Sequence, residues 1–112
     1  MRISLEISVD AIDFITLDYF LEEYYFKPSA IVSDSPGIFG GVNAVQQLRL
    51  VFAELGDPSI PSSFTIPSLH KVFGDDGKLI DEAYDKRVSK FLDEFEWYIE
   101  AFKNQRANGT PY

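Results

Sequence analysis

The sequence predicts an α/β fold, with a small parallel sheet of two or three strands and helices on its faces. Short apolar runs alternate along the chain with longer segments of helical periodicity, which is typical of α/β proteins. Hydrophobic residues make up 46% of the 112 residues, enough for one small domain with its own core. The chain shows no linker, repeat or low-complexity segment, so residues 1–112 are expected to form a single domain.

The N-terminal region is expected to form a strand and a helix. Residues 2–9 alternate between apolar and polar side chains, which indicates a strand with one covered face. Apolar positions then recur at helical spacing, so a helix is expected over residues 11–25, with Asp10 as its N-cap. Pro28 ends this helix because proline disfavours helical backbone in the residue before it.

The middle of the chain is expected to form strand, helix and strand. Residues 29–33 are short and mostly apolar, like a parallel strand that is buried on both faces. Apolar residues recur at helical spacing over residues 42–55, so a helix is expected there, and Gly56 is expected to end it. The apolar face of this helix is formed by Val45, Leu48, Phe52 and Leu55. A second strand is expected between Pro61 and Pro67, where the prolines favour an edge position.

The C-terminal third is expected to hold a short helix, a tight turn and a long helix. Residues 68–73 suit one helical turn, and residues 73–79 are rich in Gly and Asp, as turns are. A long helix follows, with Asp81 as its N-cap and an apolar stripe at three-four spacing. The stripe consists of Tyr84, Val88, Phe91, Phe95, Tyr98 or Ile99, and Phe102. Residues 105–112 are polar and are expected to fray.

Charge and composition exclude several kinds of partner. A formal net charge of −8 repels phosphate backbones, so no nucleic acid partner is expected. The absence of cysteine excludes disulfides and thiolate metal sites. No apolar run is long enough to span a bilayer and no signal-peptide pattern is visible, so we expect no membrane partner and a cytoplasmic location.

The loop that follows the strand at residues 29–33 is the best candidate binding site. It opens onto a helix N-terminus, where backbone N–H groups and the helix dipole favour a ligand. Ligands of open α/β sheets also bind at the carboxyl ends of strands. The alternative is a turn that needs glycine only for its backbone geometry, and Phe39 either stacks on a planar ring or fills the core. The candidate residues are Ser33, Ser35, Pro36, Gly37, Phe39, Gly40 and Gly41.

Other polar residues carry weaker signals. His70 is the only histidine and lacks nearby partners for catalysis or metal binding, so it is expected to be exposed. Residues 75–77 resemble part of a calcium loop but lack its further ligands, and no metal site is expected. Arg49 either pairs with acidic residues at a subunit interface or is a surface charge. No catalytic side chain is expected.

From residue 11 onward, the chain resembles the C-terminal part of the NADPH-dependent FMN reductase family, which has a flavodoxin-like fold. The similar pieces occur in the family's order, at residues 11–14, 27–33, 40–41, 47–49 and 73–81. Two family signatures are absent. One is the Gly-Ser-x-Arg loop that holds the flavin phosphate, and the other is the Pro-Glu-Tyr-Asn segment along the isoalloxazine ring. Residues 1–10 diverge from the family pattern.

The resemblance implies an FMN-dependent NAD(P)H oxidoreductase, which passes hydride from NAD(P)H through the flavin to a small-molecule electron acceptor. Such chemistry needs no protein nucleophile. The resemblance places residues 33–41 beside the flavin ring. Without the phosphate loop, FMN binding is expected to be weak or to depend on a partner, and a homo-oligomer is expected. The alternative is a non-catalytic remnant or oligomerisation module, and a third interpretation is that an N-terminal half is encoded upstream.

Overall fold

A small parallel sheet with helices on both faces forms the centre of the molecule. The computed structural model describes residues 24–112, so the strand expected at residues 2–9 and most of the helix expected at residues 11–25 lie outside the described residues. The elements in order are strand β1 (Ser29–Asp34), helix α3 (Val42–Glu54), strand β2 (Ser59–Ile66), helix α4 (Leu69–Val72) and helix α5 (Ala83–Arg106). Strands β1 and β2 pair in parallel, so the predicted α/β class is confirmed.

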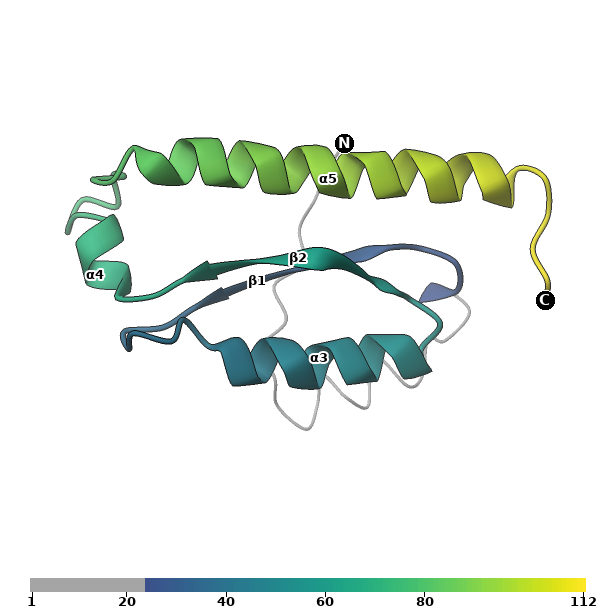
Figure 1. Ribbon diagram of the computed structural model, residues 1–112, viewed down its shortest axis with the longest axis horizontal. Coiled ribbons are helices and arrows are strands. Elements are labelled where there is room, and N and C mark those ends of the chain that lie inside the picture. The colour runs from purple at the N-terminus through teal and green to yellow at the C-terminus, as the bar shows by residue number, and fades with distance from the viewer. Residues whose placement is uncertain (1–23) are drawn as a thin grey trace.

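The described elements form three layers, with α5 over one face of the sheet and α3 over the other (Figure 1). Neighbouring residues of β1 point to opposite faces, as in any strand. Ile31 joins the core on the α3 side, and Ala30 packs against the core on the α5 side. The α3-side core contains all four apolar residues predicted for that helix, Val45, Leu48, Phe52 and Leu55.

Strand β1 is covered on both faces only in its first half. Ile31 is buried and Ala30 is half-buried, but Val32 is 59% exposed. Helix α5 lies mainly over β2, and it therefore leaves this part of β1 uncovered. The expectation of burial on both faces is wrong for Val32.

Strand β2 starts earlier than predicted and contains a bulge. Ser29 pairs with Ser59 and Ile31 pairs with Ser63. The chain therefore advances by two residues on β1 and by four residues on β2 between these two pairs. Pro61 lies inside the strand rather than at its start. The bulge explains how the strand tolerates it, because residues 60–62 are outside the ladder and the missing N–H of Pro61 removes no ladder hydrogen bond.

Two charged side chains hold this bulge, one from each neighbouring helix. Arg49 of α3 donates from Nη1 to the carbonyl oxygen of Ile60 (2.7 Å) and from Nη2 to that of Pro61 (2.8 Å). Glu94 of α5 accepts from both the backbone N–H and the hydroxyl of Ser62. Arg49 therefore binds backbone carbonyls of its own chain, a role that neither sequence interpretation included.

The segment between β2 and α5 follows the prediction closely. Helix α4 lies within the short helix expected at residues 68–73, and an antiparallel bridge between Phe73 and Leu79 closes the predicted turn. Asp81 accepts a hydrogen bond from the backbone N–H of Ala83 at 3.0 Å. The N-cap of α5 is Glu82, so the prediction of Asp81 as N-cap is wrong by one residue, although the Asp81 carboxylate satisfies the N–H group of Ala83 at the start of the helix.

Helix α5 is longer than the sheet that it covers. Its 24 residues span about 36 Å, whereas the eight residues of β2 span about 26 Å. The C-terminal end of the helix therefore reaches past the start of β2 (Figure 1). The helix continues to Arg106, beyond the predicted start of fraying, and the ring of Tyr112 packs on Tyr25 and Phe26 at centroid distances of 5.4 and 4.9 Å.

Candidate functional site

The candidate loop, residues 35–41, joins the carboxyl end of β1 to the N-terminus of α3. It lies at the edge of the sheet where both parallel strands end (Figure 1). Of the predicted site residues, Ser33 lies near the end of β1 and the others lie in the loop. This edge is where ligands of open α/β sheets bind.

Two serine side chains fix the path of the loop. The hydroxyl of Ser33 donates to the carbonyl oxygen of Gly40 at 2.6 Å, and the hydroxyl of Ser35 accepts from the N–H of Gly37 at 3.0 Å. The proton of Ser33 is therefore used inside the loop. The proton of Ser35 is still available, so of the two serines only Ser35 has the proton to act as a ligand donor.

The start of α4 borders the loop, a contact that the sequence does not predict. The N–H of Ser68 donates to the carbonyl oxygen of Gly37 (2.9 Å), and the N–H of Leu69 donates to that of Ser35 (3.2 Å). The N–H of Ser35 in turn donates to Ile66 at the end of β2 (3.2 Å). These bonds hold the loop in one position against the second strand.

The loop uses most of its carbonyl groups as hydrogen-bond acceptors, and the N–H groups of its second half have no acceptor among the described residues. The carbonyl oxygens that accept hydrogen bonds are those of Ser35, Gly37, Phe39, Gly40 and Gly41. Within the part of the chain that the structure describes, the N–H groups of residues 38–41 have no hydrogen-bond acceptor. No side chain of residues 24–112 caps the N-terminus of α3, and its first turn holds no acidic residue. The edge is therefore rich in donors and carries the positive end of the helix dipole.

Two of the predicted glycines are required by packing. Gly40 has φ of +59°, and a Cβ there would lie 3.2 Å from both the backbone nitrogen of Pro67 and the Cβ of Thr65. Gly41 has φ of +77°, and a Cβ there would lie 3.3 Å from the Cβ of Ser33. Both positions lack room on the side that faces the protein. Backbone geometry thus accounts for these two glycines without a ligand.

Phe39 lies at the surface, so the interpretation that it fills the core is wrong. It is 77% exposed, and its neighbour Ile38 is 73% exposed. Pro36 and Gly37 are exposed as well. Large apolar side chains at a loop tip lose contact with water when a flat ligand covers them, which favours ligand binding here.

The remaining predicted residues lie outside the loop. His70 is exposed on α4, as expected. In the turn before α5, Asp76 forms an ion pair with Lys78 at 3.7 Å. The described residues contain no group of three His, Cys, Asp or Glu side chains that would hold a metal ion. Residues 24–112 also contain no helix with the length and apolar character needed to cross a bilayer.

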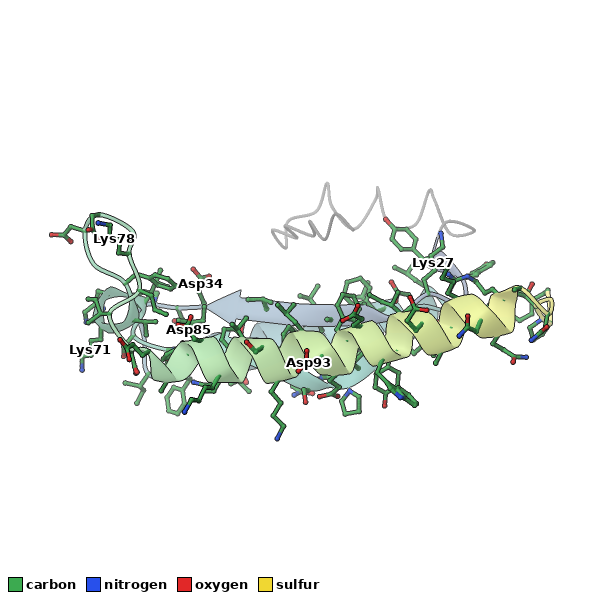
Figure 2. The ribbon with its side chains drawn as sticks, turned by 90° about the horizontal axis from the view of Figure 1, so that it is seen from above. Lys27, Asp34, Lys71, Lys78, Asp85 and Asp93 are labelled. Atoms are coloured by element: carbon green, nitrogen blue, oxygen red, sulfur yellow. The ribbon has the colours of Figure 1, made fainter. Side chains whose placement is uncertain are left out.

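The sequence reasoning missed one buried acid, Asp57, which precedes β2 at the opposite edge of the sheet. Its Oδ1 atom has no hydrogen-bond partner among the described residues. Burial raises the pKa of the Asp57 carboxyl to about 7, against the opposing effects of a hydrogen bond from Ser29 and the charge of Lys27. Figure 2 shows Lys27 at the end of the molecule away from Asp34, which closes β1 beside the loop. Asp57 is therefore not part of the candidate site.

Comparison with known families gives one result. The model of the NADPH-dependent FMN reductase family matches residues 9–71, more than half of the chain, and the match includes β1, the loop, α3 and β2. Helix α5 and the similar segment at residues 73–81 lie beyond the match. A comparison with curated proteins finds no match. The parallel sheet with helices on both faces is part of a flavodoxin-like fold, and the chain belongs to the NADPH-dependent FMN reductase family.

Proposed function

We propose that residues 35–41 bind the isoalloxazine ring of FMN and that the chain takes part in electron transfer from NAD(P)H to a small-molecule acceptor. One observation carries the proposal. The N–H groups of residues 38–41 have no acceptor among the described residues, and they lie beside the exposed ring of Phe39. A flavin ring has hydrogen-bond acceptors along its edge and flat apolar faces, so it complements both features.

Each part of the loop has a role in this proposal. The N–H groups of residues 38–41 hydrogen-bond the ring edge, and the N-terminus of α3 favours negative charge that develops there. Phe39 covers part of a ring face and keeps water away, while the hydroxyl of Ser35 provides a further donor. Bound FMN supplies the hydride-accepting centre, so no side chain of the chain has to act as nucleophile.

The phosphate of FMN has few partners here. Lys71 is exposed on α4, the helix that borders the loop, but Asp34 is exposed at the end of β1 (Figure 2). The sequence also lacks the phosphate-binding Gly-Ser-x-Arg segment. Each missing charge-assisted hydrogen bond is worth roughly 1.5–3 kcal/mol, so the loss of two or three weakens binding by about three orders of magnitude or more. We therefore propose an FMN affinity in the micromolar range.

A titration of the full chain with FMN, followed by flavin fluorescence, tests the proposal. We expect a change of flavin fluorescence that saturates by about 100 μM FMN, since sites with micromolar Kd fill at that level. Phe39→Ala should weaken binding several-fold. Trp97→Ala is the matched control, because Trp97 is an exposed aromatic residue on α5, away from the loop. Unchanged fluorescence over this range contradicts the proposal.

A second candidate function is a non-catalytic oligomerisation module. Large apolar side chains are exposed outside the loop as well, on β1, α3 and α5: Val32, Leu50 and Trp97. Contacts between copies of the chain would cover such residues. FMN binding without oxidation of NADPH, together with a dimer in sedimentation, would favour this function. A monomer that oxidises NADPH in the presence of FMN would exclude it.

A further inference from the structure

The C-terminal end of α5 lies at the end of the molecule away from the loop (Figure 1). A cavity of about 410 Å³ is lined by residues of this end of the helix. Its volume falls within the range of small-molecule sites, roughly 300–1,000 Å³. The lining comes from the turn before β1, from α5 and from the tail that follows it. It includes Phe26, Ala101, Phe102, Gln105, Arg106 and Pro111.

The cavity exists because α5 extends past the sheet. Ala101, Phe102, Gln105 and Arg106 recur at helical spacing, so they share one face of its last two turns. At this end of the helix the strands no longer lie beneath that face. Phe26 and the tail flank it instead and leave a space between them.

The walls of the cavity are held by specific contacts. Nη1 of Arg106 donates to the carbonyl oxygen of Phe26 at 2.7 Å. The ring of Tyr112 packs on that of Phe26, and the hydroxyl of Thr110 donates to an oxygen of the terminal carboxylate of Tyr112 at 2.9 Å. The site is thus formed before any ligand arrives, which lowers the entropic cost of binding.

The residues that line the cavity favour a ligand of a particular shape and charge. The rings of Phe26 and Phe102 and the ring of Pro111 offer flat apolar surfaces, which suit an aromatic ligand. Among the described residues that line the cavity, Arg106 is charged and none is acidic, although the whole chain carries a net charge of −8. A guanidinium group binds carboxylates and sulfonates through directed N–H donors.

The negative end of the α5 dipole does not oppose an anion strongly here. The carbonyl oxygens of Lys103, Gln105 and Arg106 accept hydrogen bonds from the N–H groups of residues 107–109. Lys103 and Arg106 also place positive charge in the last turn. The geometry points to a binding site for a planar aromatic compound that carries one negative charge, separate from the loop and from any flavin.

The test uses the full chain with 2-naphthoate as the probe and 2-naphthamide as its uncharged counterpart. Isothermal titration calorimetry should show naphthoate binding with Kd on the order of 100 μM, as expected for a ligand of this size. The amide should bind about tenfold more weakly, because the interaction with the charge of Arg106 is lost.

Substitutions locate the site. Ala101→Leu should narrow the cavity and weaken binding of both compounds, whereas Ala107→Leu, on an exposed residue outside the lining, should leave binding unchanged. The Arg106→Gln variant should bind naphthoate and naphthamide with equal affinity, and the Arg106→Lys variant should again bind naphthoate more tightly. Circular dichroism confirms that each variant is folded.

Three outcomes would overturn the inference. One is absence of naphthoate binding at millimolar concentration. Another is equal binding of acid and amide by the unaltered chain, which would remove the charge preference. The third is undiminished binding by a folded Ala101→Leu variant, which would place the probe elsewhere.

Discussion

Ser33 and Gly40 close the loop at the carboxyl end of β1, through a 2.6 Å hydrogen bond from the Ser33 hydroxyl to the Gly40 carbonyl oxygen. The bond joins residues seven positions apart and ties the end of a strand to the residue before the α3 N-cap. It also gives the carbonyl oxygen of Gly40, a buried residue, a hydrogen-bond partner. The donor-rich character of the loop therefore depends on the folded backbone more than on any ligand.

Ser33→Ala should lower both stability and FMN affinity. The substitution leaves the Gly40 carbonyl without its partner, and the loss is expected to be about 1 kcal/mol, or about fivefold in affinity. Ser89→Ala is the control, because the Ser89 hydroxyl donates to the backbone carbonyl oxygen of Asp85 on the exposed surface of α5. Urea denaturation and the FMN titration measure the two effects. Equal behaviour of the two variants would contradict the role of Ser33.

Gly40→Ala should destabilise the fold more than Gly77→Ala. Both glycines have positive φ, +59° and +75°, so both variants incur backbone strain of about 1–2 kcal/mol. Only at Gly40 would the new methyl also lie 3.2 Å from the Pro67 nitrogen and the Thr65 Cβ, whereas no atom lies within 4 Å at Gly77. The difference between the two urea midpoints measures this crowding, and the absence of a difference would refute the close packing of the loop.

Arg49→Met should destabilise the protein by about 2 kcal/mol, since two carbonyl groups of the β2 bulge lose a charged donor. Methionine retains much of the apolar stem of arginine. The loss should change little with added salt, because the acceptors are neutral carbonyls rather than carboxylates. Lys90→Met on the exposed face of α5 is the control. A loss of stability that disappears at high salt would indicate an ion pair instead.

The buried carboxyl of Asp57 should make stability depend on pH. Its pKa is about 7 in the folded chain against an ordinary value of 3.8, so between these values the folded state holds the proton more tightly than the unfolded state. This contribution to stability is fully present below about pH 4, falls as pH rises, and is lost above about pH 7. The total is at most about 4 kcal/mol.

Asp57→Asn isolates this contribution. The amide cannot ionise, so the variant should gain stability relative to the unaltered chain as pH rises from about 4 to about 8. Urea denaturation of both chains at several pH values measures the difference. A constant difference across that range would show that Asp57 does not titrate in the folded state as described.

Apolar periodicity predicted the α/β class and the packing of α3, because the buried side of a helix repeats every three to four residues. Val45, Leu48, Phe52 and Leu55 are all buried. It did not predict the exposure of Val32, because α5 lies mainly over β2 and leaves part of β1 bare. The bulge at Pro61 was also not predicted. Its backbone groups are hydrogen-bonded by side chains of two helices, and neither side chain is near Pro61 in the sequence.

The position of the candidate loop was predicted, since its glycines and serines lie between an apolar strand and a helix. The sequence did not predict the direction in which each side chain of the loop points. Phe39 is exposed although apolar residues are usually buried, and Ser33 uses its proton within the loop. Contacts with α4 also depend on tertiary structure. Asp57 gave no sequence signal, because an acid beside a proline commonly marks an exposed turn.

The bulge of β2 hinders the addition of a further strand to the β2 side of the sheet. The carbonyl oxygens of residues 60 and 61 and the N–H of Ser62 are already engaged, and Pro61 has no N–H to offer. On β1, the N–H groups of Ser29 and Ser35 point to β2, so those of the alternate residues, such as Val32, point the other way. Any additional strand, whether in normal assembly or in aggregation, is therefore expected to join along β1.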